Sequence, residues 1–121
     1  MKTSLPLLLS ATALLAACSW FVPQPDSDLV ERVHKAIPDG TPLEAAEETL
    51  HRMNFNCARR RGSYTDEAGT NHDDAYFSEC TELPTSKISL SCSNRNQVIL
   101  VPNSQSLVRS VSVIRSPYCG S

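Results

Sequence analysis

The sequence contains no apolar run long enough to cross a membrane. Its longest apolar stretch, LPLLLSATALLAA near the N-terminus, has about 13 residues, whereas a helix that spans a bilayer needs about 20. Lys2 precedes this stretch, and the small residues Ala16 and Ala17 end it. A basic residue, a short apolar segment and small residues before a cleavage point are typical of a removable secretory leader. We therefore expect residues 1–17 to be a signal peptide.

Motifs of the common catalytic and metal sites are also missing. The chain has no phosphate-binding loop, no serine nucleophile elbow and no HExxH. It has no CxxC, and none of His34, His51 and His72 stands at ligand spacing from a cysteine, which argues against zinc. A Cys57–His51 nucleophile pair would need a free thiolate, and export favours a disulfide instead. These observations predict a protein that is not an enzyme and holds no metal, with His34 and His51 solvated on the polar sides of helices.

A strong charge of either sign is absent as well. Removing Lys2 from 11 basic residues leaves 10 against 13 acidic ones, a formal net charge of −3. The basic run Ala58–Arg61 is too short to suggest nucleic acid, so we interpret it as a solvated strand face rather than a contact with anionic lipid headgroups. Asn71–Asp74 offers oxygen ligands, but it lacks the alternating ligands and the glycine of a calcium loop, which favours a solvated acidic loop.

The end of the apolar stretch, Leu15-Ala16-Ala17-Cys18, resembles the lipobox of bacterial lipoproteins. The resemblance implies a diacylglycerol thioether on Cys18, cleavage just before it and, in Gram-negative bacteria, acylation of the new amino group. Each buried CH₂ of an acyl chain contributes about 0.8 kcal/mol, and two or more chains anchor a protein stably. Covalent lipid such as palmitate is thus the expected modification, and no other cofactor is predicted.

The residues after the lipobox bear on where the anchored protein would lie. Ser19, rather than aspartate, follows Cys18. In lipoproteins of this kind, that residue implies sorting to the outer membrane, with the protein facing the periplasm. The inner membrane is the location expected if sorting differs. We expect residues 18–27 to form a short tether that prolines keep extended. Trp20 and Phe21 follow the expected anchor closely in sequence, and aromatic rings favour the headgroup zone.

Four further cysteines are Cys57, Cys80, Cys92 and Cys119. An even number in a small exported domain predicts two disulfides, and four cysteines allow three pairings. Cys57 and Cys92 are each expected on the apolar side of a strand, and their strands could be neighbours, which favours Cys57–Cys92 with Cys80–Cys119. The alternative of Cys57–Cys80 with Cys92–Cys119 stays open.

The mature domain, residues 28–121, begins with two helical patterns. Apolar residues recur at helical spacing over Asp28–Ile37. Thr41-Pro42-Leu43-Glu44 has the pattern of a capping box with proline at the first helical position. Asn54 stands where a helix end commonly requires a left-handed residue. We expect two helices separated by a turn at residues 38–40.

Alternation of apolar and polar residues then predicts strands and an α+β fold. Two N-terminal helices would pack on one face of a three- to four-stranded antiparallel sheet. A loop is expected over Gly62–Asp74, and the serine-rich face of the sheet would meet water or a partner. The predicted strands are Phe55–Arg61, Lys87–Ser93, Gln97–Val101 and Leu107–Arg115, with an ambiguous segment at Ala75–Glu82.

This order of elements, with the segments Gly40–Ala46 and Leu50–Phe55, resembles the BamE/SmpA type of outer-membrane lipoprotein and the beta-lactamase-inhibitor-like domains of the same layout. Such domains commonly bind other proteins, although no binding residue can be carried over. The resemblance and the lipobox predict a membrane-anchored, non-catalytic module that binds another envelope protein or supports the envelope. The alternative is a small anchored or secreted enzyme inhibitor that would use the Gly62–Asp74 loop.

Overall fold

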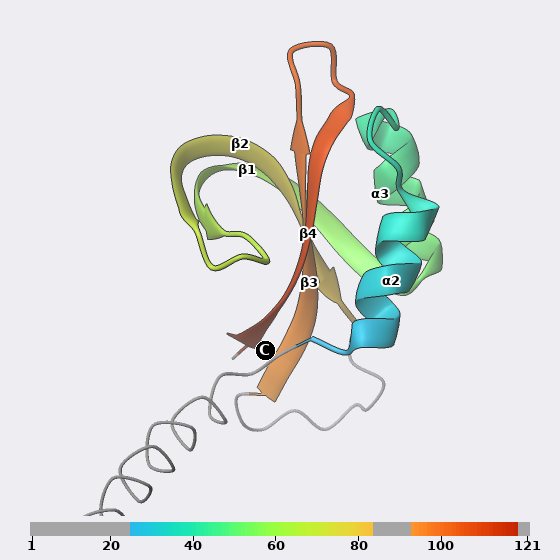
Figure 1. Cartoon of the computed structure of the whole chain (residues 1–121), viewed down its shortest axis with the longest axis vertical. Coiled ribbons are helices and arrows are strands. Elements are labelled where there is room, and N and C mark those ends of the chain that lie inside the picture. Colours follow the sequence, from blue (N-terminus) through green and yellow to red (C-terminus); the bar gives the residue numbers. More distant parts are fainter. Residues whose placement is uncertain (1–24, 84–92, 119–121) are drawn as a thin grey trace, which may run out of the picture.

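The computed structural model describes residues 25–83 and 93–118 of the chain, which form two helices and one antiparallel sheet (Figure 1). The sheet has four strands, hydrogen-bonded in chain order. This confirms the predicted α+β class, with the helices preceding the sheet. Neither helix of the described part has the length and apolar character needed to span a membrane. The elements are α2 (Ser27–Ala36), α3 (Leu43–Arg52), β1 (Phe55–Thr65), β2 (Asn71–Glu82), β3 (Ser93–Pro102) and β4 (Val108–Tyr118).

The first helix forms because its sequence has both a cap and an apolar stripe. The Asp26 side chain accepts a hydrogen bond from the backbone N–H of Asp28, which satisfies one free donor of the first turn. Leu29, Val33 and Ile37 recur every four residues and are buried. The predicted helix Asp28–Ile37 therefore agrees with α2 to within one residue at each end.

The second helix starts differently from the prediction. Pro42 occupies the cap position of α3, and no side chain caps the helix. The hydroxyl of Thr41 donates instead to the carbonyl of Pro38, 2.6 Å away, so the capping box is wrong. The carbonyl of Thr41 also accepts a hydrogen bond from Val108 N of β4 at 2.7 Å, and this contact holds Thr41 away from the end of the helix. At the other end Asn54 has a φ of 74°, the left-handed conformation that its position predicted.

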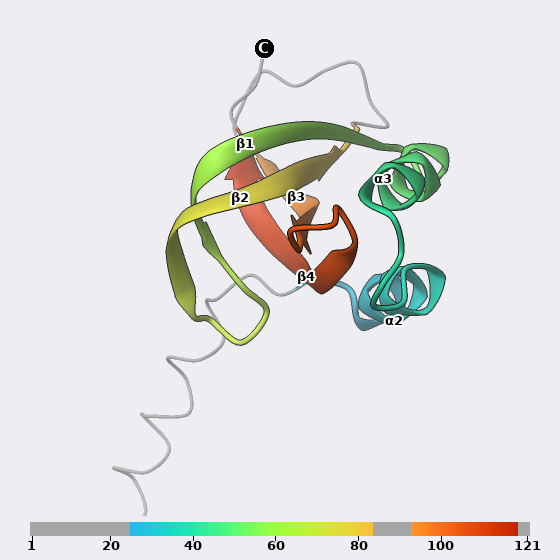
Figure 2. The same ribbon diagram turned by 90° about the horizontal axis from the view of Figure 1, so that it is seen from above.

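Both helices cover the same face of the sheet, and the main core lies between them (Figure 2). Burial of the apolar stripes in this layer is the main force that holds the helices to the sheet. The residues of this main core come from both helices and all four strands. They are Leu29, Val33, Ile37, Leu43, Ala46, Leu50, Phe55, Cys80, Val98, Leu100, Val108, Val111 and Val113.

The later strands agree with the prediction where the structure describes them. Gln97–Val101 lies within β3, and all but the first residue of Leu107–Arg115 lies within β4. The ambiguous segment Ala75–Glu82 forms most of β2. Of the predicted strand Lys87–Ser93, only the last residue falls within the described part of the chain.

The predicted loop Gly62–Asp74 is wrong, because β1 and β2 run through it and leave only a turn at residues 66–70. The Asp66 side chain accepts hydrogen bonds from two backbone N–H groups of this turn, at 3.0 and 2.9 Å. Gly69 has a φ of +86°, which glycine adopts without steric cost. The turn is therefore tightly hydrogen-bonded, and its length is typical of a β-hairpin.

A β-bulge bends this hairpin. Gly62 pairs with Ala75 but Tyr64 pairs with His72, so β2 contains one extra residue. Asp74 takes up the extra length in a left-handed conformation with a φ of 51°. Bulges bend strands and increase their twist. The far end of the β1–β2 hairpin accordingly curls over the sheet face opposite the helices (Figures 1 and 2).

The curled hairpin creates a second apolar cluster, made of Tyr64, Phe77, Ile99 and Val101. All four side chains are at most 9% exposed. Ser112 of β4 is only 4% exposed. The serine-rich face, which was expected to meet water or a partner, is thus partly covered by the domain's own hairpin.

Candidate ligand-binding cup

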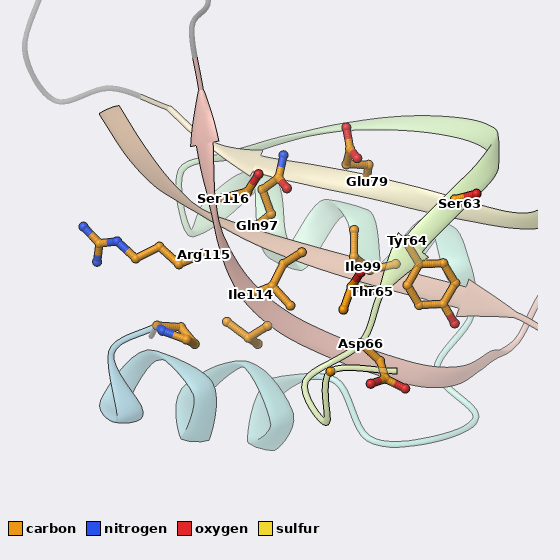
Figure 3. Close-up of a pocket in the computed structure, with 13 residues that line it drawn as sticks. Ser63, Tyr64, Thr65, Asp66, Glu79, Gln97, Ile99, Ile114, Arg115 and Ser116 are labelled. Carbon is orange, nitrogen blue, oxygen red and sulfur yellow. The ribbon is translucent and has the colours of Figure 1, made fainter. Parts of the chain in front are cut away.

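The space beneath the curled hairpin is only partly filled, and a cavity of about 450 Å³ remains (Figure 3). We call it the cup. The second apolar cluster lies next to the cup, and Tyr64 and Ile99 belong to both. The cup therefore extends from this cluster toward the solvent. Its lining residues are Pro25, Ser63, Tyr64, Thr65, Asp66, Gly69, Glu79, Gln97, Ile99, Val113, Ile114, Arg115 and Ser116.

The floor of the cup is apolar and firmly packed. Tyr64, Ile99 and Ile114 supply it from three different strands (Figure 3). The Tyr64 ring stacks on the His72 ring, with centroids 4.7 Å apart, and lies 5.1 Å from the Phe77 ring. Burial raises the pKa of the Tyr64 hydroxyl. These ring contacts pack the Tyr64 side chain against its neighbours on β2.

Polar groups gather at another part of the lining. Glu79 of β2 lies 3.5 Å from Arg60 Nη1, and its side chain keeps 29% of its surface exposed. Gln97 of β3 donates through Nε2 to Thr81 Oγ1 at 3.1 Å. Arg115 points away from the cavity (Figure 3). The cup thus offers acceptors rather than a positive charge to a ligand.

Asp66 holds the turn that forms one wall. Its Oδ2 lies 2.9 Å from His72 Nε2, while its Oδ1 accepts from the turn backbone. The hydrogen bond with His72, together with those from the backbone, holds the pKa of Asp66 below its usual value. All these contacts lie within the hairpin, so Asp66 serves the shape of the wall.

Glu67 fastens the curled hairpin to the rest of the domain. Its Oε1 lies 2.6 Å from His34 Nε2 on α2 and accepts a hydrogen bond from the backbone N–H of Val113 on β4 at 2.8 Å. The carboxylate thus satisfies a donor on the outer edge of an edge strand. His34 takes part in this clasp while its side chain stays 42% exposed, and His51 is exposed as well, so both histidines lie at the surface as expected.

The three arginines of the basic run Ala58–Arg61 pair with carboxylates of the domain. Arg59 Nη2 lies 2.7 Å from Glu47 Oε1, and Arg61 Nη1 lies 3.4 Å from Asp74 Oδ1. Arg60 pairs with Glu79. All three remain between 41% and 63% exposed. The predicted exposed strand face is confirmed, with charges that are neutralised locally.

The disulfide that the structure contains joins Cys57 to Cys80. The two residues are directly opposite each other on β1 and β2. The favoured pairing of Cys57 with Cys92 is wrong, because β2 separates β1 from β3 in the sheet. The alternative pairing contains the observed bond. Cys92 and Cys119 lie outside the described residues, and so does Cys18.

Asn71–Asp74 is not the solvated loop that was expected. It opens β2, where the Asp73 carboxylate accepts hydrogen bonds from Ser63 Oγ at 2.9 Å and Asn71 Nδ2 at 3.2 Å. Among the described residues, no three histidine, cysteine, aspartate or glutamate side chains come together as metal ligands do.

The sequence analysis did not predict the cup, although the sequence shows which residues of β2 and β3 share its side of the sheet. Phe77 and Glu79 share one side of β2, and Gln97 and Ile99 share one side of β3. Such alternation can be read from the sequence. The folding back of the hairpin, which brings Tyr64 over these residues, depends on the bulge and could not be read in the same way.

Comparison of the chain with protein-family models, with curated proteins and with solved structures gave no match.

Proposed function

We propose that this chain is a membrane-anchored lipoprotein whose α+β domain binds another envelope protein without catalysing a reaction. The lipobox supports the anchor, and the cup supports the binding. Cys18 precedes Pro25, which lines the cup, by seven residues. A fully extended chain spans at most about 3.6 Å per residue, so the cup would act within about 25 Å of the anchored sulfur.

The observation that carries the binding proposal is a concave, preformed cavity with an apolar floor and a few polar groups. Its volume of about 450 Å³ falls in the range of about 300–1,000 Å³ that is usual for binding sites. The disulfide, the bulge and the Glu67 clasp fix its walls. A preformed site loses little conformational entropy on binding.

The chemistry of the lining defines what a partner should present. An apolar or aromatic side chain would pack against Ile99 and Ile114. A donor or a cation beside it would meet the carboxylate of Glu79, which is partly exposed and retains acceptor capacity. One protruding side chain of a partner fits this description.

The rival function, enzyme inhibition, would use the hairpin at Gly62–Asp74 as an exposed loop. Its turn is held by hydrogen bonds, as an inhibitory loop would require. However, Glu67 at its tip bonds to the domain's own α2 and β4. Since the tip forms a wall of the cup, we favour binding within the cup.

The test uses site-specific photo-crosslinking in native membranes. A photoreactive amino acid replaces Gln97 in the cup in one form of the protein, and exposed Leu83 outside the cup in the control. Both are compared with the same forms carrying Cys18→Ser. We expect a discrete crosslinked protein from the Gln97 position only, and only in the anchored form. Equal crosslinking from both positions would rule out the cup as the binding site.

A further inference from the structure

The sheet has two edge strands, and the domain covers the outer edge of one of them with its own groups. This strand is β4, the last in the sheet. The carboxylate of Glu67 accepts a hydrogen bond there from Val113 N at 2.8 Å. Val108 N donates to Thr41 O at 2.7 Å, and Val108 O accepts from Gly40 N at 2.8 Å. These contacts occupy backbone groups of β4 that could otherwise pair with a strand of another chain.

β1 is the other edge strand, and alternate residues in it direct their backbone groups away from β2. Leu83 N donates to Asn54 O at 2.9 Å, so the pair just before β1 is hydrogen-bonded. Hydrogen-bonded and non-hydrogen-bonded pairs alternate along an antiparallel ladder. The Cα atoms of Cys57 and Cys80 are 3.9 Å apart, which agrees with the closer spacing of a non-hydrogen-bonded pair. The residues whose N–H and C=O groups point outward are therefore Phe55, Cys57, Arg59 and Arg61.

The outer edge of β1, which we define as residues 55–61, is open. Among residues 25–83 and 93–118, no hydrogen bond is made to its outward backbone groups. All residues of Ala58–Arg61 are exposed, whereas a strand that is buried on one face alternates between buried and exposed positions. β1 also runs along the outer margin of the ribbon (Figure 2). The backbone donors and acceptors of β1 are thus accessible to another strand.

The side chains along this edge are cationic. Arg60 pairs through Nη1 with Glu79 at 3.5 Å, and Arg61 pairs through Nη1 with Asp74 at 3.4 Å. The two arginine side chains are 53% and 63% exposed. A guanidinium carries five N–H donors, and the domain's own contacts engage one nitrogen of each. A carboxylate on an added strand can therefore meet the same guanidinium from the outer side.

We propose that the outer edge of β1 is a docking site for an extended, acidic segment of a partner protein, which adds a strand to the sheet. In this mode of recognition, main-chain hydrogen bonds give affinity and side chains give specificity. A second copy that added its own β1 in antiparallel fashion, centred on Arg60, would place arginine against arginine, which is destabilising. Carboxylates have the matching charge. The inference goes beyond the proposed function, because residues 55–61 do not line the cup.

The experiment follows amide hydrogen exchange by NMR in the protein purified from membranes in a neutral detergent. The probe is a peptide of about ten residues in which valine and glutamate alternate, and a valine–lysine peptide is the control. At saturation the acidic peptide should slow the exchange of the Arg59 and Arg61 amides about tenfold or more. The Arg60 amide, which already bonds to β2, should not change. The basic peptide should bind about tenfold more weakly.

Two substitutions separate the charge from the backbone. Arg61→Glu should weaken binding of the acidic peptide about tenfold and strengthen binding of the basic one. Arg32→Glu, the same change on α2 at a side chain that is 60% exposed, should leave both unaltered. Arg61→Pro removes one outward amide and keeps the ladder with β2, because proline is tolerated on the outer side of an edge strand. It should prevent docking of either peptide. If Arg61→Pro does not fold, Arg61→Glu decides.

Three results would overturn the docking site. One is binding of the acidic peptide that leaves the Arg59 and Arg61 amides exchanging as fast as in the free protein. Another is an equal effect of Arg61→Glu and Arg32→Glu. The third is protection of these amides that appears without peptide and rises with protein concentration, because a second copy would then be the occupant. The cup is tested separately, by the crosslinking from Gln97.

Discussion

Replacement of Glu47 by alanine should destabilise the domain more than the same replacement at the other carboxylates of α3. The Glu47 side chain is 19% exposed and joins three elements. It accepts hydrogen bonds from Arg59 Nη2 at 2.7 Å and Nε at 3.2 Å on β1, and from Ser78 Oγ at 2.7 Å on β2. This network fastens α3 to the two strands that carry the cup's hairpin.

The expected magnitude follows from what each partner loses. Ser78 is fully buried, and leaving its hydroxyl without the carboxylate costs about 1–3 kcal/mol. Arg59 is 41% exposed and returns to water at little cost. With the packing of the Glu47 side chain, we expect a loss of about 3 kcal/mol in the free energy of unfolding. For a domain of this size that lowers Tm by about 12–24 °C.

The effect should also depend on pH. Burial opposes ionisation of Glu47, but the hydrogen bonds from Arg59 and Ser78 outweigh it and hold the pKa below its usual value of 4.5. A carboxylate whose pKa is lowered on folding stabilises the native state above its unfolded pKa. That contribution is lost as the pH falls through the folded pKa. The gap between wild type and Glu47→Ala should therefore narrow below pH 4.5.

Urea denaturation followed by circular dichroism measures both effects, with Glu48→Ala as the matched control. Glu48 neighbours Glu47 on α3, but its side chain is 70% exposed and lies 3.7 Å from Arg52. Such exposed pairs contribute about 0.5 kcal/mol or less. Equal losses in the two variants, or a Glu47→Ala effect that does not change with pH, would refute the role of the network.

Three further predictions concern the hairpin. Replacing both cysteines of the β1–β2 disulfide, which are 23 residues apart, should cost about 3.4 kcal/mol in the loop-entropy model; an unchanged urea midpoint would contradict it. Glu67→Ala should speed hydrogen exchange of the Val113 amide about tenfold, since that amide loses a hydrogen bond to a charged acceptor; unchanged protection would show that the clasp does not hold β4. His72→Ala should raise the pKa of Asp66 toward its usual value in an NMR titration, whereas a constant pKa would remove His72 as the cause.

The parts of the fold that depend on local sequence were predictable. The spacing of Leu29, Val33 and Ile37 identified α2, because a helix repeats every 3.6 residues whatever its surroundings. Asn54 identified the end of α3, since few other residues tolerate its backbone conformation. A local signal was not sufficient everywhere, since the capping-box pattern that begins at Thr41 failed where Thr41 instead bonds to Pro38 and Val108.

The parts that depend on register were not predictable. Residues 62–65 of β1 and 71–74 of β2 were expected in a loop, because these residues are mostly polar and exposed and do not alternate clearly, whereas the preceding part of β1 was predicted as a strand. The partner of Cys57 follows from the pairing of β1 with β2, and sequence spacing alone does not set that pairing. The cup could not be predicted for the same two reasons, because the hairpin of β1 and β2 forms its walls.

The most direct test of the proposed function is intact-mass spectrometry of the processed protein from the membranes of its native host. The account predicts a chain that begins at Cys18 and carries a diacylglycerol group on the sulfur, with or without an amide-linked acyl chain. A mature chain that begins at any other residue, or a Cys18 without lipid, would contradict the membrane anchor on which the proposal depends.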